Sequence, residues 1–569
     1  MRELKQEAPY AAMVMLGFAL VGYFFFTGLY CSDDTRYLIG AIKVAVGEPI
    51  SVASLAERRA MFLLPGAMLY RPDASLEWMI VPYALLFVVL GLAGYLAARQ
   101  FLGRWAAIAG MALAAAQPVF FLYAGAMLPD LSSTLFLIVG LLYLCRWVHQ
   151  VVPSAEGAQR DSRGAAFLLG LSMALAFTIK ESGLVLMPVV AAVMILAGAK
   201  AGWGRFLRDV ALAAAGFLLL LGLEALLFKA VAGQWYSSVG SLLVPHDLAG
   251  FADSQGHGVI DRLKTLKMVL GGYTTLLCVL AGLSTLQLFA SWLRGRMSWA
   301  QALTWLALVG FWLWPLLYFT FGSASLKSYL LPVMQQRYYA PSIIPAAILV
   351  AHLGAVVIRQ GRLLMPAWIP VATMGLCLLV LLSAPYRQRH ERGLIYDAPA
   401  KEAFRQAERD MRRRYPGIPF HDVHSGSSTD QNRCRALLMP VRDDGSNRLM
   451  TAIHSGADLR GDDFGYQPPV VGKLPILMAG NGAYMDDPKA FPWVATVQQG
   501  VASGQMKLTL VGRYGLLSPR ALRGKSWLPR TVAGEQAEVL APTPSAEEAA
   551  RPTTPQQVEV YLVEAVQRR

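Results

Sequence analysis

Long apolar runs alternate with short polar gaps over the first two-thirds of the chain. A helix needs about 20 apolar residues to cross the hydrocarbon core of a bilayer. Eleven runs come near this length, so the pattern predicts an all-α polytopic membrane bundle. Only Lys180-Glu181-Ser182 separates the fifth run from the sixth, which fits either two thin spans or one re-entrant pair. The predicted spans are 10–30, 79–98, 105–124, 131–148, 165–179, 183–199, 209–229, 274–293, 299–320, 340–358 and 365–385.

The pattern changes after residue 385. A charged, helix-like stretch at 399–414 is followed by short apolar runs that read as strands, and a linker rich in Pro, Ala, Glu and Thr covers 540–557. The predicted strands are 436–441, 470–478, 493–498, 506–511 and 558–565. We therefore expect a transmembrane domain over 1–385 and a small soluble α/β domain over 386–569.

Composition agrees with this division. The 569 residues are 55% hydrophobic and 15% charged, whereas ordinary soluble domains are nearer a quarter charged. Charged residues number 43 among the first 385 positions and 45 among the last 184. A single water-soluble globule and a disordered chain are both poor interpretations of such a sequence.

Membrane topology explains the net charge of +14 better than nucleic-acid binding does. Nucleic-acid binding needs basic residues clustered on a soluble face. Alternate short gaps between the apolar runs are basic, and such gaps lie on the cytoplasmic side, as does the N-terminus with Arg2 and Lys5. The basic gap residues are Arg99 and Arg104; Arg146, Arg160 and Arg163; Lys200, Arg205 and Arg208; Arg294 and Arg296; Arg359 and Arg362. The segments 31–78, 125–130, 230–273 and 321–339 and the whole tail then face outward.

The most informative polar segment follows the first span and reads Asp33-Asp34-Thr35-Arg36-Tyr37. Two carboxylates and an arginine lie at a span exit, and the residues after them predict an amphipathic helix resting on lipid at the outer interface. A lone Asp at such a place is best explained as a helix cap. The Asp-Asp-x-Arg-Tyr combination favours a functional site.

A second acid, Asp130, lies in the very short outer gap Ala126-Met127-Leu128-Pro129-Asp130-Leu131. Ionisable groups held near the membrane plane are costly and usually face a bundle interior or a cavity. Pro129 also marks a helix start, so an N-cap is an equal and compatible interpretation.

Basic side chains gather on the same predicted outer side, where they offer an anion site at the level of the lipid headgroups. The arginine fork binds two phosphate oxygens at once, and an aromatic neighbour suits a sugar ring. For each basic residue alone, snorkelling from a helix end is the simpler explanation. The residues are Arg36, Arg58, Arg59, Lys180 and Arg337, the last within Gln335-Gln336-Arg337-Tyr338-Tyr339-Ala340-Pro341.

Five cysteines without a CxxC or a Cys/His cluster argue against a zinc or redox site. We predict no metal site. A divalent cation held by two acids is the alternative.

The three motifs together resemble the clan C (GT-C) integral-membrane glycosyltransferases. Within that clan the chain looks most like the bacterial aminoarabinose–lipid A transferases and the protein O-mannosyltransferases, whose Asp-Glu-x-Arg-Tyr motif lies on a juxtamembrane helix. Here the second acid is Asp34. The resemblance covers the order of features over residues 10–345.

The resemblance implies roles for individual residues. Asp33 matches the catalytic carboxylate of the family, and Asp130 matches a second acid that lines the cavity. Arg36 and Tyr37 complete the helix motif, while Arg337 and Tyr338 match a site for the lipid phosphate or sugar.

One motif departs from the family pattern. Aminoarabinose transferases carry Glu-Lys-Pro-Pro further along the first loop, with the lysine at the donor phosphate, and the comparable place here reads Glu57-Arg58-Arg59-Ala60. Either arginine could replace that charge, and the missing prolines leave the donor sugar open.

The activity implied is transfer of a monosaccharide from a polyprenyl-phosphate donor to a lipid, glycan or protein acceptor at the outer face of a bacterial inner membrane. We expect inversion at the anomeric carbon, with Asp33 as general base and cations holding the phosphate. A transporter or lipid-linked-sugar flippase is the main alternative, although the notable charges gather at one face instead of at mid-depth. A membrane scaffold for the external domain would leave the acids without a role.

Overall fold

The computed structural model divides the chain into two compact units, Met1–Phe26 with Gly40–Gln388 and Thr27–Ile39 with Arg389–Arg569. Each unit is described by itself below. The structure describes residues 2–24, 33–51, 54, 56–71, 76–124, 126–152, 161–241, 258–323, 331–332, 334–364, 407, 410–411, 413–416, 418, 420–423, 476–480, 497, 499–515, 538–540 and 557–565.

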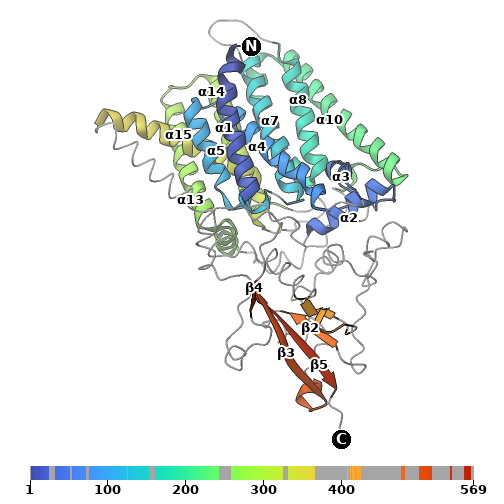
Figure 1. Ribbon diagram of the computed structural model, residues 1–569. Helices are drawn as coiled ribbons and strands as arrows, with labels where there is room; N and C mark the ends of the chain where they lie inside the picture. Colours follow the sequence, from blue (N-terminus) through green and yellow to red (C-terminus); the bar gives the residue numbers. More distant parts are fainter. Residues whose placement is uncertain are drawn as a thin grey trace. The chain divides into compact units, whose positions relative to one another are not determined.

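The first unit is built of helices (Figure 1). Its α-helices are α1 (Arg2–Phe24), α3 (Ala60–Ala67), α4 (Val81–Ala98), α5 (Arg104–Ala115), α6 (Pro118–Tyr123), α7 (Pro129–Val151), α8 (Arg163–Ile179), α9 (Met187–Ala201), α10 (Trp203–Ala232), α11 (Ser238–Ser241), α13 (Val259–Leu293), α14 (Trp299–Phe321) and α15 (Ala340–Leu364). Three 3₁₀ segments connect them: η1 (Leu76–Ile80), η2 (Glu181–Leu186) and η3 (Gln336–Tyr339).

Seven helices in the described ranges are long and apolar enough to cross a membrane, and α5 and α8 are shorter apolar helices. The prediction of a polytopic helical bundle is therefore confirmed. The eleventh predicted span, 365–385, lies outside the described residues. The seven candidate spans are Trp78–Ala98, Pro129–Val151, Glu181–Lys200, Trp203–Ala232, Val259–Leu293, Trp299–Phe321 and Gln336–Gln360.

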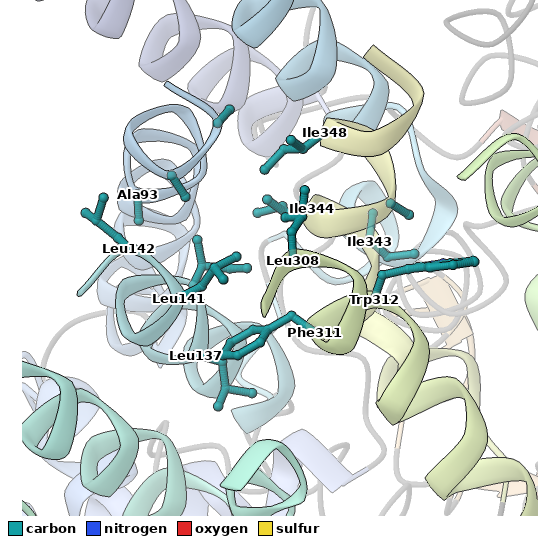
Figure 2. Close-up of a cluster of buried hydrophobic side chains, with 14 of the residues drawn as sticks. Ala93, Leu137, Leu141, Leu142, Leu308, Phe311, Trp312, Ile343, Ile344 and Ile348 are labelled. Atoms are coloured by element: carbon teal, nitrogen blue, oxygen red, sulfur yellow. The ribbon is translucent and has the colours of Figure 1, made fainter. Parts of the chain in front are cut away.

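Four helices, α4, α7, α14 and α15, supply the centre of the core. Figure 2 shows their branched and aromatic side chains meeting, with Leu137 and Leu141 of α7 near Phe311 of α14 and Ile344 of α15. Of the apolar stretch of α7 that could span a membrane, 78% is buried, whereas only 17% of the corresponding stretch of α10 is buried. Helix α7 is thus the central element, while α10 presents most of its apolar surface outward, as expected of a lipid-facing helix.

Helices α8 and α10 pack through glycines. A Cβ atom added to Gly170 of α8 would lie 1.8 Å from the carbonyl oxygen of Ala213. A Cβ atom added to Gly216 of α10 would lie 2.4 Å from the carbonyl oxygen of Phe167. Such backbone contact is what small residues permit between helices in a membrane.

Two predicted spans differ from the helices observed. The single span 105–124 is wrong, because Pro118 cannot continue α5 and holds Gln117 in an extended conformation, so α5 and α6 are separate. Helix α13 begins well before the predicted residue 274. Charged residues in its first part lower the hydropathy there, so the apolar run does not reveal the true start of the helix. It bends at Gly271, whose φ of 71° favours glycine.

The predicted juxtamembrane helix is α2 (Asp33–Val46). Its residues 33–39 are assigned to the second unit and 40–46 to the first. Ala41 and Ile42 are fully buried. The expectation that this apolar face rests on lipid is therefore wrong, because it packs against protein: a Cβ on Gly40 would meet Leu63 at 3.0 Å.

The second unit contains the small sheet that the tail pattern predicted. Its strand order is β1-β2-β5-β3-β4, with β1 and β2 parallel and the other pairs antiparallel. The strands are β1 (Phe420–Val423), β2 (Ile476–Gly480), β3 (Met506–Gly515), β4 (Glu538–Leu540) and β5 (Gln557–Ala565).

The predicted strands near 470–478, 506–511 and 558–565 overlap β2, β3 and β5. The predicted strand 436–441 lies outside the described residues. The one at 493–498 is described only at Val497, which is helical, so the prediction is wrong there. Of the predicted helix 399–414, the described positions are helical.

We predict that Gly170→Leu separates α8 from α10 and lowers the thermal stability of the purified protein, because a side chain has no room against the α10 backbone. Gly222→Leu on α10 is the matched control, since nothing lies within 4 Å of a Cβ there. Unfolding midpoints measured in detergent should fall for the first variant and stay near the wild type for the second. Equal midpoints would contradict the glycine contact.

Candidate functional site: a buried cationic cluster

A buried ion pair joins two helix ends of the first unit. Asp130 lies in the first turn of α7, and Lys180 follows the last residue of α8 in an extended conformation. The Lys180 Nζ donates a hydrogen bond to Asp130 Oδ1, and the side chains are only 11% and 3% exposed. A carboxylate near a helix N-terminus and an ammonium near a C-terminus are each favoured by the helix dipoles.

Arg337 of η3 approaches the same carboxylate, with Nε 3.9 Å from Asp130 Oδ2. Its Nε also donates to Gln335 Oε1 at 2.9 Å. The ring of Tyr338 receives both cations on its π-system, with Lys180 Nζ 4.1 Å and Arg337 Cζ 5.6 Å from the ring centroid. Three segments far apart in sequence therefore meet at Asp130.

Two further arginines are held by Glu181, the residue after Lys180. Arg58 Nε lies 3.2 Å from Glu181 Oε1, and Arg59 Nη2 lies 2.6 Å from Oε2. Both arginines are buried, and Arg59 also acts electrostatically on Asp130 and on Lys180. The Nη2 of Arg58 is buried without a hydrogen-bond partner among the described residues.

The backbone around Lys180 is held by close packing. A Cβ on Gly183 would lie 2.5 Å from the carbonyl carbon of Ala176, so glycine lets η2 fold back against the end of α8. Ser133 of α7 donates to the Ala176 carbonyl oxygen at 3.0 Å. These contacts set the register of α7 and α8 and so bring Lys180 to Asp130.

Among the described residues, the ion pairs of the cluster join four cations, at Arg58, Arg59, Lys180 and Arg337, to two carboxylates, those of Asp130 and Glu181. A surplus of buried positive charge is costly unless an anion offsets it. The arrangement is therefore suited to binding an anion such as phosphate, for which arginine forks and a lysine are common partners.

Burial lowers the pKa of Lys180, in the turn between the helices, to about 8, and the charges of Arg337 and Arg59 act in the same direction. The Asp130 carboxylate opposes this shift. Asp130 thus keeps Lys180 protonated. Both carboxylate oxygens of Asp130 face cations, so Asp130 acts as the counter-charge of Lys180 and Arg337.

The residues of the Asp-Asp-x-Arg-Tyr motif are assigned to the second unit and are described by themselves. Asp33 begins α2, and its side chain lies outside the described residues. Asp34 and Tyr37 are buried, and Arg36 is exposed. Their roles, and those of the cluster residues, stay predictions.

Glu181 is the member of the cluster that the sequence analysis did not select. Its signal was its place beside Lys180 in the only polar gap between two short apolar runs. A buried arginine pair needs a counter-charge, and an unassigned acid in such a gap is a natural candidate.

Within the described ranges, no group of three or more His, Cys, Asp or Glu side chains is placed to hold a metal ion.

We predict that Asp130→Asn destabilises the protein by about 3–5 kcal/mol, because it leaves Lys180 buried without its carboxylate. With Asp130 gone, burial and the charges of Arg337 and Arg59 lower the pKa of Lys180 without the carboxylate that opposed them. The double variant Asp130→Asn/Lys180→Met should recover part of the loss, as measured by the unfolding midpoint in detergent. A double variant no more stable than Asp130→Asn alone would contradict the pairing.

No protein-family model and no curated protein matches the sequence. Among solved structures, the chain is similar to ArnT from Cupriavidus metallidurans bound to undecaprenyl phosphate, with 14% identity, a TM-score of 0.48, and coverage of 89% of this chain and 96% of that chain. It is also similar to the archaeal oligosaccharyltransferase AglB from Archaeoglobus fulgidus in complex with an inhibitory peptide and a dolichol-phosphate, with 12% identity, a TM-score of 0.49, and coverage of 91% and 74%. A third similar structure is arabinosyltransferase EmbB from Mycobacterium smegmatis, with 14% identity, a TM-score of 0.40, and coverage of 61% and 30%. At this level the likeness is one of chain arrangement and does not extend to individual residues.

Proposed function

We propose that the chain is a glycosyltransferase that moves a monosaccharide from a polyprenyl-phosphate donor to a hydroxyl or phosphate of an envelope acceptor. The observation that carries the proposal is the buried cationic cluster, in which four cations outnumber two carboxylates. The Asp33-Asp34-Thr35-Arg36-Tyr37 motif on α2 supplies the sugar-transfer chemistry by its resemblance to the clan C enzymes.

The charge surplus suits the leaving group better than the donor. A sugar linked to polyprenyl phosphate is a phosphodiester with one negative charge. When the bond to the anomeric carbon breaks, that electron pair stays on the phosphate oxygen, so the released monoester has a second charge. A site rich in fixed cations therefore stabilises the transition state more than the bound donor, which is the condition for catalysis.

In the proposed mechanism, Asp33 takes the proton of the acceptor hydroxyl as that oxygen attacks the anomeric carbon, with inversion. Asp130, assigned as a second acid of the cavity, acts here by holding Lys180 and Arg337 in place. No metal is required. A divalent cation on the acids is the alternative, and chelation separates the two.

The remaining assigned residues bind the donor. Arg59, Lys180 and Arg337 face the phosphate, and the Tyr338 ring offers a surface for the sugar. Asp34, Arg36 and Tyr37 are assigned to substrate binding by the resemblance of their motif on α2 to the clan C enzymes.

The proposed location is the outer face of a bacterial inner membrane, with the N-terminus in the cytoplasm. The domain 386–569 is then periplasmic, where it is positioned to help select a lipid, glycan or protein acceptor. This orientation follows from the basic residues in alternate short gaps of the sequence.

We expect Asp33→Asn to reduce transfer by about 10²–10⁴-fold, the usual contribution of a general base. The assay uses purified protein in nanodiscs, radiolabelled polyprenyl-phosphate sugars and envelope extracts as acceptors. Asp161→Asn is the matched control, because the side chain of that acid is 74% exposed and its ion pair among the described residues is with Arg163.

Retained transfer by a folded Asp33→Asn protein would refute the base assignment. Movement of labelled lipid across the bilayer without any transferred sugar would instead show a flippase. Activity that disappears in EDTA and returns with Mg²⁺ or Mn²⁺ would contradict the metal-free mechanism.

We also expect Arg59→Gln to raise the donor KM by about tenfold, the effect of losing a charged hydrogen bond, and by more than Arg58→Gln. Both arginines pair with Glu181, and Arg59 acts in addition on Lys180 and Asp130. Steady-state kinetics at constant acceptor measure the difference. A larger effect of Arg58→Gln would reverse the assignment between the two arginines.

A further inference from the structure

A buried arginine that the sequence analysis passed over lies at the start of α13. Arg262 is 1% exposed, while its neighbours Val259, Ile260 and Leu263 are 64%, 68% and 48% exposed. The charged neighbours Asp261 and Lys264 are also exposed, so Arg262 turns inward while the residues around it face out. A charge buried in this way is retained only where its partners compensate its desolvation.

The partners are backbone carbonyls at the end of the neighbouring helix. Arg262 Nε donates to the Thr320 oxygen at 2.9 Å and Nη2 to the Phe319 oxygen at 3.3 Å. These carbonyls belong to the last turn of α14, where intrahelical donors run out and a cation is favoured by the helix dipole.

The same guanidinium reaches the segment that leads into η3. Its Nη2 donates to the Pro332 carbonyl oxygen at 2.8 Å. Met334 is 2% exposed and Tyr339 is fully buried, with the Tyr339 hydroxyl 3.5 Å from Thr320 Oγ1. The short stretch between Pro332 and Tyr339, which includes Arg337 and Tyr338, is thus held at both ends on one helix terminus.

We infer that Arg262 is a positioning residue, which holds the segment 334–339 against α14 and thereby places Arg337 and Tyr338 beside Lys180 and Asp130. Its effect on ligand binding rests on the proposed function, while its effect on the segment does not.

The first test follows the segment directly. In Arg262→Gln, backbone amide hydrogen exchange over 334–339 should rise at least about tenfold, because a buried anchor is lost and the segment opens locally. Thr274→Val is the matched control: it removes another buried side-chain bond of α13, from Thr274 Oγ1 to Gln117 Oε1 at 3.1 Å, twelve residues further along the helix. Unchanged exchange over 334–339 in Arg262→Gln, or an equal rise in Thr274→Val, would overturn the inference.

The second test is a double-mutant cycle with undecaprenyl phosphate as the binding probe. Arg337→Gln and Arg262→Gln should each raise its Kd by about tenfold, and the double variant should be no weaker than Arg337→Gln alone, because both changes remove the same contact. Thr274→Val should leave the Kd unchanged. Multiplicative losses would show that Arg262 only stabilises the fold and would overturn the positioning role.

The two tests separate this inference from the proposed function. If the wild-type protein does not bind undecaprenyl phosphate, the polyprenyl-phosphate donor is refuted and hydrogen exchange alone decides the inference. If the wild type binds and the exchange over 334–339 does not change in Arg262→Gln, the donor site stands and the positioning role falls.

Discussion

The ion pair of Lys180 with Asp130 sets the conditions for the other charges at this end of the helical unit. An ammonium in an apolar bundle loses its hydration, and the carboxylate is what keeps it protonated there. Once the pair is formed, the approach of Arg337 and Arg59 leaves a local surplus of positive charge that Asp130 and Glu181 offset only in part. These described ion pairs therefore favour the binding of an anion beside the cations.

Helix ends, and not long loops, supply this chemistry. Asp130 begins α7, Lys180 follows α8, Arg59 directly precedes α3 and Arg337 lies in the 3₁₀ turn before α15. A helix end inherits the rigidity of the helix behind it, and sites built on such elements are more precise than sites on loops. The packing of α7 against α8 therefore fixes the distance between Asp130 and Lys180.

Much of this organisation could be predicted from the sequence, for identifiable physical reasons. Hydropathy locates helices such as α4 and α14 closely because an apolar run has to be long to span a bilayer. It locates β2 and β3 less closely because strands need few residues. It failed at Pro118, where one run contains two helices, and at the start of α13, where charged residues belong to a continuing helix.

The candidate site was predictable to a similar degree. Asp130 and Lys180 stand out as charges at very short gaps between apolar runs, and Arg59 and Arg337 stand out within the polar motifs of the outer segments 31–78 and 321–339. Arg262 does not, since it lies among Asp261, Lys264 and Lys267, and nothing in the sequence distinguishes the one side chain of that group that turns inward. Orientation about a helix axis depends on the neighbours it packs against, and those come from distant parts of the chain.

The bend at Gly271 has a consequence for how the protein responds to bilayer thickness. Helix α13 has 35 residues, or about 52 Å at 1.5 Å per residue, far more than the hydrocarbon core can accommodate upright. Because the chain turns at Gly271, residues 272–293, about 33 Å long, can tilt to match a thinner or thicker membrane. The first twelve residues of α13, joined to α14 through Arg262, need not follow that tilt. A mismatch between helix length and bilayer thickness is then accommodated by residues 272–293.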